Sequence, residues 1–377
     1  MIELCPADRG PDPAVLHSPG GFTWFYVDLV DDNGRGATLI WSWGLPFLPG
    51  YAHASRVGRP QLPIDRPSVN LVVYGGGRER FYLLSELSRD QCSWSDDGRS
   101  WRMGECSFQW IDTPGRGGAA PTRTLQADLD LALPTGGRAT GQLRLSGALR
   151  RDAPDFCGIG PSDPECTHTW TPMIAASRGE LELKTPDTTL RVEGRGYHDR
   201  NSAHQPLHEL GIGSWWWGRI AMPGRDLIFY RLNPSSPAAA AQDVVVEFGA
   251  DGTCRAPARA ELQPERMSRS TWGLRWPRTT SFGDPDGRTV HVETVARLDN
   301  GPFYQRYQLR GRCGDEVGHG IGENLVPDRV DSDLLRPLVR MRVHRADGPN
   351  SMWLPLFSGD VDGRVRRLLG RSGHIRV

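Results

Sequence analysis

The sequence lacks the features that would place the protein in a membrane, outside the cell or on nucleic acid. No run of about 18 consecutive apolar residues occurs, so no membrane-spanning helix is expected. The stretch from Met1 to Pro6 has neither the basic nor the apolar region of a secretory signal. Lys+Arg and Asp+Glu are both 45, which leaves no positive field for nucleic acid. We therefore expect a soluble, cytoplasmic protein without a nucleic-acid partner.

Signatures of metal, redox and nucleophilic sites are also missing. The 7 cysteines include no Cys-x-x-Cys pair. Cys157 and Cys166 flank a Gly/Pro-rich loop and could be bridged, but free thiols are more typical of a cytosolic protein. No Gly-x-Ser-x-Gly nucleophile elbow occurs. His319, Glu323 and Asp328 lie close together, yet their spacing does not match a helical ligand pair. We therefore expect neither a metal nor another cofactor.

What the sequence contains instead is a succession of short strand patterns. Gly 45 and Pro 30 are typical of many strands joined by turns. Helical periodicity is plausible only over 332–343, where Pro337 would break or kink the helix, and near residues 365–369. Strands are predicted at residues 22–30, 37–43, 69–74, 80–84, 124–133, 141–149, 180–184, 188–193, 215–220, 226–232, 244–248, 290–298 and 303–309.

The strand patterns predict an all-β protein made of antiparallel sandwiches or barrels. Most strands have one apolar face, and turn signals separate them at short intervals. A turn at residues 96–98 would place Trp94 and Trp101 opposite each other on neighbouring strands. We expect an irregular lead-in at residues 1–17 and two β domains, at 18–205 and 206–377.

The most informative motif contains an acid and a phenol two residues apart. On an extended strand Tyr197 and Asp199 would leave the same face, and His198 would leave the opposite face. The alternative is that Asp199 and Asn201 cap a turn at the end of the strand, as these residue types commonly do. The local sequence leaves both interpretations open.

Two further groups of aromatic residues lie near this motif in the sequence. His168 and Trp170 would share one strand face, although each could instead be an ordinary core residue. Trp215, Trp216 and Trp217 are consecutive, so at least one of them must face a second surface. That surface could be a pocket, a domain interface or a second layer of the core.

An acid among aromatic rings suits a reaction that begins with protonation of an alkene. Burial among apolar rings disfavours ionisation, so Asp199 could remain a proton donor near neutral pH. Aromatic faces can also stabilise a passing cation. The sequence therefore predicts acid catalysis on an apolar substrate.

Several stretches of the chain match motifs of one known family. They are Pro19-Gly20-Gly21-Phe22-Thr23-Trp24-Phe25-Tyr26-Val27-Asp28, Asn70-Leu71-Val72-Val73-Tyr74-Gly75, His168-Thr169-Trp170-Thr171-Pro172, Gly196-Tyr197-His198-Asp199-Arg200-Asn201, and the tryptophan cluster followed by Gly218-Arg219. In these stretches the chain resembles the carotenoid 1,2-hydratase (hydroxyneurosporene synthase) family.

This resemblance implies a pair of lipocalin-like β domains and a hydro-lyase of carotenoid biosynthesis. The implied reaction is cofactor-free hydration of the terminal 1,2 double bond of an acyclic carotenoid such as neurosporene or lycopene, giving a 1-hydroxy tertiary alcohol. Asp199 would be the proton donor, with Tyr197 or His168 positioning water and Trp170 stabilising the cation. The residues implied to bind the substrate are Trp215, Trp217 and Asn201.

The resemblance also leaves other functions open. Fungal lipocalin-like Diels–Alderases share the architecture, so a cyclase or isomerase acting on another terpenoid or polyene is one alternative. A non-catalytic lipid-binding protein is another, in which Asp199 only caps a turn. A polyene substrate would also allow peripheral membrane association for substrate access.

Overall fold

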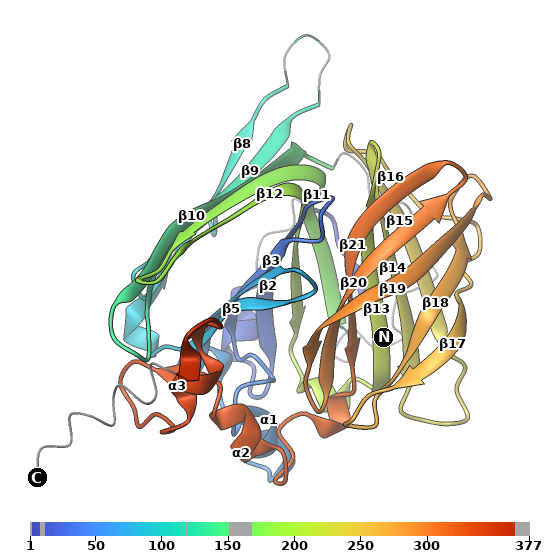
Figure 1. Cartoon of the computed structure of the whole chain (residues 1–377). Helices are drawn as coiled ribbons and strands as arrows, with labels where there is room; N and C mark the ends of the chain where they lie inside the picture. Colours follow the sequence, from blue (N-terminus) through green and yellow to red (C-terminus); the bar gives the residue numbers. More distant parts are fainter. Residues whose placement is uncertain (1, 8–11, 116, 118–119, 151–167, 366–377) are drawn as a thin grey trace, which may run out of the picture.

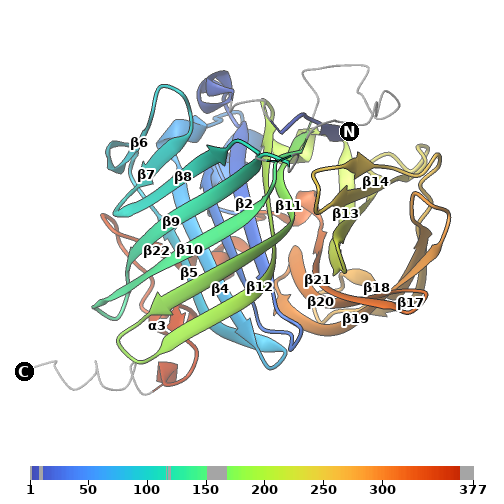
Figure 2. The ribbon, with the colours of Figure 1, turned by 90° about the horizontal axis from the view of Figure 1, so that it is seen from above.

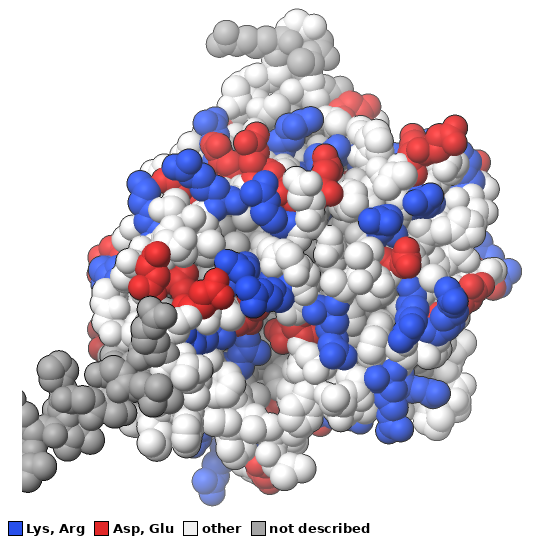
Figure 3. All heavy atoms as spheres, viewed as in Figure 1, with Lys and Arg blue, Asp and Glu red and all other residues white. Residues whose placement is uncertain are grey.

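The computed structural model describes residues 2–7, 12–115, 117, 120–150 and 168–365. Within these ranges most of the chain forms β-strands, arranged in two curled sheets that pack against each other (Figures 1 and 2). The predicted all-β, lipocalin-like class is confirmed. Cys157, Cys166 and residues 366–369 lie outside the described residues. Figure 3 shows basic and acidic side chains interspersed over one face of the molecule.

The first sheet contains 14 strands of the described chain, in the order β22-β5-β4-β3-β2-β12-β11-β10-β9-β8-β7-β6, with β1 paired to β11 and β23 to β5. Its strands are β1 (Ile2–Leu4), β2 (Phe22–Val30), β3 (Gly36–Trp43), β4 (Pro67–Gly75), β5 (Arg78–Glu86), β6 (Cys92–Trp94), β7 (Ser100–Met103), β8 (Cys106–Thr113), β9 (Thr122–Ala132), β10 (Arg138–Ala148), β11 (His168–Lys184), β12 (Thr189–Ala203), β22 (Val343–Arg345) and β23 (Gly359–Asp360).

The second sheet contains 9 strands of the described chain, in the order β16-β15-β14-β13-β21-β20-β19-β18-β17. Its strands are β13 (Ile212–Met222), β14 (Arg225–Pro234), β15 (Gln242–Gly249), β16 (Cys254–Arg255), β17 (Gln263–Arg269), β18 (Arg275–Gly283), β19 (Thr289–Asn300), β20 (Tyr304–Cys313) and β21 (Glu316–Leu325). The predicted boundary near residue 205 falls between β12 and β13. Strands β22 and β23 come after that boundary and nevertheless extend the edge of the first sheet.

Helices are short in the described part of the chain. The α-helices are α1 (Tyr51–Arg56), α2 (Arg336–Arg340) and α3 (Leu354–Phe357), and the 3-10 helices are η1 (Pro13–His17), η2 (Pro63–Asp65), η3 (Arg89–Gln91), η5 (Leu207–Glu209) and η6 (Pro327–Arg329). The helix predicted over 332–343 is wrong in extent, because Pro337 lies in the first turn of α2 and not within a longer helix. None of the described helices has the length and apolar character needed to span a bilayer.

The β2–β3 hairpin, predicted from its turn residues, is confirmed. The Asp31 carboxylate accepts hydrogen bonds from the backbone N–H groups of Asn33 and Arg35, at 2.9 and 2.7 Å. Gly34 completes the turn with φ 74°, a conformation that glycine adopts without strain. The predicted pairing of Trp94 with Trp101 is confirmed as well, since the two residues are direct partners across β6 and β7.

Three hydrophobic cores explain why so many strands are buried on both faces. One lies inside the curl of the first sheet and includes Trp41 and Leu181. Another lies inside the second sheet and includes Trp216 and Phe229. The third lies between the sheets and joins β2, β4, β5, β11 and β12 to β13, β14 and β15. The tryptophans of β13 therefore divide as alternation requires: Trp216 faces the second sheet's own core, and its two neighbours face the first sheet.

A buried ion network also joins the two sheets. Arg219 on β13 pairs with Asp28 on β2 and with Asp226 on β14, and all three side chains are fully buried. Asp226 Oδ2 also accepts a 2.8 Å hydrogen bond from the backbone N–H of Ala176, which lies in a bulged stretch of β11 with φ 47°. Separating these buried ions would leave each charge without a counter-ion and without water. The network therefore fixes the positions of β2 and β11 relative to β13 and β14.

Candidate active site

Asp199 lies within strand β12, on the face that meets the second sheet. Tyr197, Asp199 and Asn201 alternate along this strand, so their side chains leave the same face. His198 leaves the opposite face, where its Nε2 accepts a 3.0 Å hydrogen bond from the indole N–H of Trp110. The interpretation of Asp199 and Asn201 as turn caps is therefore wrong, because β12 continues past both of them.

Three hydrogen bonds hold the Asp199 carboxyl. Its Oδ2 accepts from the indole N–H of Trp170 and from the Tyr197 hydroxyl, each at 2.8 Å. Its Oδ1 accepts a 2.8 Å bond from the side-chain amide of Asn201. Strand β11 brings Trp170 to this position because Trp170 and Asn201 are direct partners across β11 and β12. The acid is thus fixed by residues of two neighbouring strands.

The environment of Asp199 favours its protonated form. Burial raises the pKa of Asp199 to about 8, and the negative charges of Glu323 and Asp28 add to this effect. The hydrogen bonds from Tyr197 and Trp170 oppose it, because they stabilise the carboxylate. Burial outweighs them, so the carboxyl carries a proton at neutral pH.

His168 continues the hydrogen-bonded chain from Asn201. Because the Asn201 amide nitrogen donates to Asp199, the Asn201 oxygen faces His168, whose Nε2 lies 3.0 Å away. Burial lowers the pKa of His168 to about 4, so the ring is neutral at pH 7 and Nε2 carries its one proton. Nδ1 is then an acceptor, and it has no hydrogen-bond partner among the described residues.

Two neighbouring cavities lie between the two sheets, and Asp199 lines the smaller of them. The smaller one has a volume of about 30 Å³ and is lined by Asp199, Asn201 and His168 together with aromatic residues and Glu323. The larger one has a volume of about 320 Å³ and is mainly apolar. They share the wall residues Trp24, Tyr26, Trp215 and Glu323.

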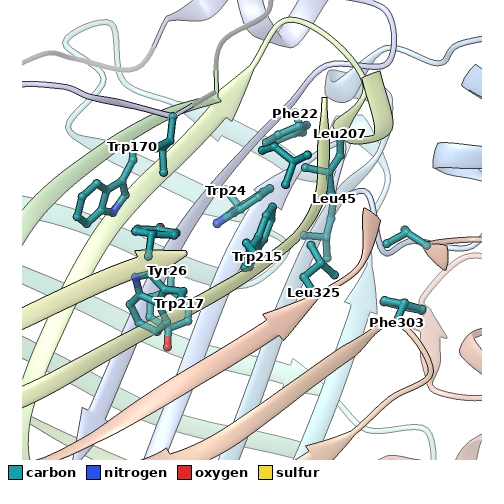
Figure 4. Close-up of a cluster of buried hydrophobic side chains, with 14 of the residues drawn as sticks. Phe22, Trp24, Tyr26, Leu45, Trp170, Leu207, Trp215, Trp217, Phe303 and Leu325 are labelled. Carbon is teal, nitrogen blue, oxygen red and sulfur yellow. The ribbon is translucent and has the colours of Figure 1, made fainter. Parts of the chain in front are cut away.

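Aromatic side chains surround the smaller cavity. Figure 4 shows Trp24, Tyr26, Trp215 and Trp217 converging from β2 and β13 on the space beside Trp170. The ring of Trp215 lies 5.8 Å from that of His168, and the ring of Trp217 lies 5.5 Å from that of Tyr26. Such a set of ring faces in a dry site can stabilise a cation by its quadrupoles.

The structure brings together all seven residues that the sequence suggested for the site. Asp199, Tyr197, Trp170, Asn201 and His168 form one hydrogen-bonded chain. Trp215 and Trp217 of β13 pack beside that chain and line the smaller cavity. Trp170 and Tyr197 are not among the cavity's lining residues, because they lie behind the carboxyl and direct their polar atoms at it.

Four wall residues of the smaller cavity were missed by the sequence reasoning: Trp24, Tyr26, Tyr230 and Glu323. Trp24 and Tyr26 had a usable signal, since they alternate along a strand that carries one of the family motifs. Tyr230 is an ordinary strand residue in its sequence context. Glu323 was considered only as a metal ligand, together with His319 and Asp328.

The metal interpretation, which the sequence reasoning rejected, gains no support from the arrangement of these residues. Within the described ranges no group of three or more His, Cys, Asp or Glu side chains is arranged to hold a metal ion. Glu323 instead accepts two hydrogen bonds from the Arg306 guanidinium, at 2.9 and 3.0 Å.

A separate groove of about 970 Å³ lies elsewhere between the sheets. Its walls carry charges of both signs, including Arg144, Arg178, Glu180 and Glu193. These four side chains are exposed to solvent. An apolar polyene fits the mainly apolar cavity beside Asp199 better than this polar groove.

Comparison with known proteins places the chain in a family. Residues 40–351 match the family model described as carotenoid hydratase CrtC. The chain is 28% identical over 342 residues to the acyclic carotenoid 1,2-hydratase of Thiocapsa roseopersicina, which covers 90% of this chain and 77% of that protein. It is also 28% identical over 362 residues to a hydroxyneurosporene dehydrogenase of Chlorobaculum tepidum, with 90% and 91% covered.

Solved structures show a related fold. The crystal structure of an AttH-like protein from Nitrosomonas europaea superposes with a TM-score of 0.55 at 14% identity, covering 85% of this chain and 99% of that one. At so low an identity the likeness concerns the fold alone.

The family match spans the strands that carry Asp199 and its hydrogen-bonding partners, although β2, with Trp24 and Tyr26, precedes it. Strands β11, β12, β13 and β21, with Asp199 and all its hydrogen-bonding partners, lie inside the matched residues 40–351. The family resemblance of the sequence motifs is thereby confirmed. The chain belongs to the carotenoid hydratase CrtC family, a family of hydro-lyases.

Proposed function

We propose that this protein hydrates the terminal 1,2 double bond of an acyclic carotenoid of the neurosporene or lycopene type, with Asp199 as proton donor. The observation that carries the proposal is a buried carboxyl, held by three hydrogen bonds, at the wall of an aromatic cavity. Family membership and the name of the Thiocapsa roseopersicina relative support the substrate class.

The first step transfers the proton of Asp199 to C2. The π electrons of the C1–C2 double bond form the new C–H bond, which leaves a tertiary cation at C1. Asp199 becomes a carboxylate that keeps three hydrogen-bond donors, from Trp170, Tyr197 and Asn201. Hydrogen bonds to a charged acceptor are about twice as strong as neutral ones, so they stabilise the charge as it develops.

The second step adds water to the cation. A water oxygen forms a bond with C1 and loses one proton, which gives a 1-hydroxy tertiary alcohol. Trp24, Trp215 and Trp217 line the cavity and are better placed than Trp170 to stabilise the cation with their ring faces. His168 is better placed than Tyr197 to contact the water, because His168 lines the cavity and its Nδ1 is an acceptor.

The larger cavity supplies a route for an apolar chain to reach Asp199. Leu338 of α2 and Phe357 of α3 line it and are themselves 38% and 36% exposed. Leu334, Met352 and Trp353 nearby in the sequence are exposed as well. This apolar surface supports peripheral association with a membrane that holds the substrate. Flotation with liposomes should show binding by the wild type and weaker binding by Leu334→Glu.

The test of the reaction uses isotopes. Pure protein should convert lycopene, without oxygen and without added cofactor, into a product heavier by one water. In heavy water the product should carry one carbon-bound deuterium at C2, and labelled water should supply the hydroxyl oxygen at C1. A cyclase or isomerase would give no oxygen label, and a lipid carrier would give no product. Product without deuterium at C2 would rule out protonation by Asp199 as the first step.

A further inference from the structure

Glu323 is a second carboxylate at the reaction cavity, contributed by the opposite sheet. It lies on β21, directly opposite Trp217 on β13 and Arg306 on β20. It lines both the small cavity beside Asp199 and the larger apolar one. Asp199 comes from the first sheet, so the two carboxyls approach the same space from different sides.

Arg306 and Glu323 form an ion pair that is largely buried. The guanidinium donates two hydrogen bonds to Glu323 Oε1, and the exposed fractions of the two side chains are 3% for Arg306 and 14% for Glu323. The guanidinium also donates to the Tyr74 hydroxyl and lies over the ring of Tyr304, 5.3 Å from its centroid. An arginine stays protonated in proteins, so the pair places a positive charge directly against the Glu323 carboxyl oxygens. Both guanidinium bonds end on Oε1, and the Tyr304 hydroxyl also contacts the Glu323 carboxyl.

The small cavity has the size and polarity of a water site. Its volume of about 30 Å³ exceeds the roughly 10–15 Å³ that one water requires. His168 Nδ1 is buried and without a partner among the described residues, and His168 belongs to the cavity wall. Water held there could donate to both His168 and Glu323, with the ring faces of Trp24 and Trp215 close by.

We propose that this cavity binds the nucleophilic water and that Glu323 is the base that takes its proton. The inference rests on the proposed hydration. After Asp199 has protonated C2, the water oxygen bonds to C1, one O–H bond breaks, and the proton moves to the Glu323 carboxylate. Glu323 ends as an acid and Asp199 as a carboxylate, and one proton exchanged through water restores both. The two carboxyls of the cavity thus take opposite roles, Asp199 as general acid and Glu323 as general base.

The experiment separates formation of the cation from its capture. Glu323→Gln keeps the shape of the side chain but cannot accept a proton, so the cation should return to alkene instead of gaining water. With lycopene in heavy water, hydration by this variant should fall roughly 10²–10⁴-fold. Recovered lycopene should gain deuterium at C2, because the step carried out by Asp199 still runs and a cation that is not captured has time to rotate about C2–C3 and give up its original hydrogen. Glu316→Gln is the matched control, since Glu316 lies on the same strand and pairs with Arg225 instead.

Three outcomes decide the role of Glu323. Hydration by Glu323→Gln at the wild-type rate would overturn it and leave the Asp199 carboxylate as the base. Equal loss of hydration and of deuterium exchange would also overturn it, because Glu323 would then act before the cation forms. Wild-type hydration product without deuterium at C2 would contradict the proposed hydration itself. The double variant Arg306→Gln/Glu323→Gln leaves no unpaired buried charge, and it should show the same preserved exchange with lost hydration if the single variant folds poorly.

Discussion

Replacing Asp199 with asparagine is the most direct test of the proton donor. The substitution keeps the shape of the side chain and removes only the transferable proton. A positioned general acid contributes roughly 10²–10⁴-fold, and the loss should be at the upper end because an isolated alkene needs a strong acid. We expect Asp199→Asn to lose hydration of lycopene and also deuterium exchange into it.

The hydrogen-bond chain explains why this variant should fold. The oxygen of an asparagine at position 199 can accept from Trp170 and Tyr197, as Asp199 Oδ2 does. Its amide would then face the amide of Asn201, which can rotate to present its oxygen. His168 is neutral and can move its proton from Nε2 to Nδ1 to accept from the rotated amide. Alanine would instead leave buried donors without acceptors, at about 1–3 kcal/mol each.

The pH dependence gives the same substitution a second readout. The folded-state pKa of Asp199 is about 8, above its value of about 4 in an unfolded chain. The buried carboxyl therefore makes its full contribution to the free energy of unfolding below about pH 4, and this contribution is lost as the pH rises from about 4 to about 8. Asparagine does not titrate, so the unfolding temperature of the variant should rise relative to wild type over this range.

Activity measurements complete the test. Wild-type hydration should fall about tenfold per pH unit above about pH 8, as the acid loses its proton. Product can be followed by mass spectrometry, and folding by circular dichroism during thermal unfolding. Near-normal hydration by a folded Asp199→Asn protein would refute Asp199 as the acid. A wild-type profile flat from pH 6 to about pH 10 would refute the raised pKa.

Three further perturbations test neighbouring parts of the argument. Trp170→Phe removes one hydrogen bond that stabilises the Asp199 carboxylate. Part of the activity should remain, and the pH above which activity falls, the alkaline limit, should rise. An unchanged alkaline limit would mean that the indole N–H does not act on the acid. Arg219→Met leaves Asp28 and its partner carboxylate unpaired in the sheet interface, and it should lower the unfolding free energy by about 3–5 kcal/mol in urea titrations. The proposed steps use only protons and water, so hydration should survive chelators and need no nicotinamide or flavin; loss restored by one particular metal would contradict this.

Local sequence patterns predicted much of the fold and one side of the site. The alternation of apolar and polar residues predicted the strands, and turn residues such as those around Gly34 predicted the hairpins. The same alternation placed Tyr197 and Asp199 on one face and separated Trp216 from its neighbours. These properties follow from the two-residue period of a strand, which a sequence displays directly.

What the sequence could not show is which strands meet across the sheet interface. Glu323 lies on β21, which pairs with β13 in the second sheet, and one face of β13 packs on the first sheet. This non-local arrangement brings Glu323 and Asp199 to one cavity. The return of β22 and β23 to β5 is equally non-local. The turn interpretation of Asn201 failed for a related reason, since β11 and β2 pair with both sides of β12 and carry it past the polar residues.

The second sheet helps to keep Asp199 protonated at neutral pH by excluding water from it, and Trp217 offers a way to test this. The indole N–H of Trp217 has no hydrogen-bond partner among the described residues, but its ring packs 6.2 Å from that of Tyr197 and lines the small cavity. Trp217→Ala should admit water, ease ionisation and lower the pKa of Asp199 from about 8. The alkaline limit of activity should then move to lower pH.

Trp216 is the matched control, because it is the next residue along the strand and faces the core of the second sheet. Trp216→Ala should destabilise the protein comparably, by about 3–5 kcal/mol, without moving the alkaline limit. Unfolding in urea would show that both variants are folded at the pH values compared. If both substitutions shift the limit equally, general loosening of the fold explains the effect. If neither shifts it, the raised pKa does not depend on the exclusion of water by the second sheet.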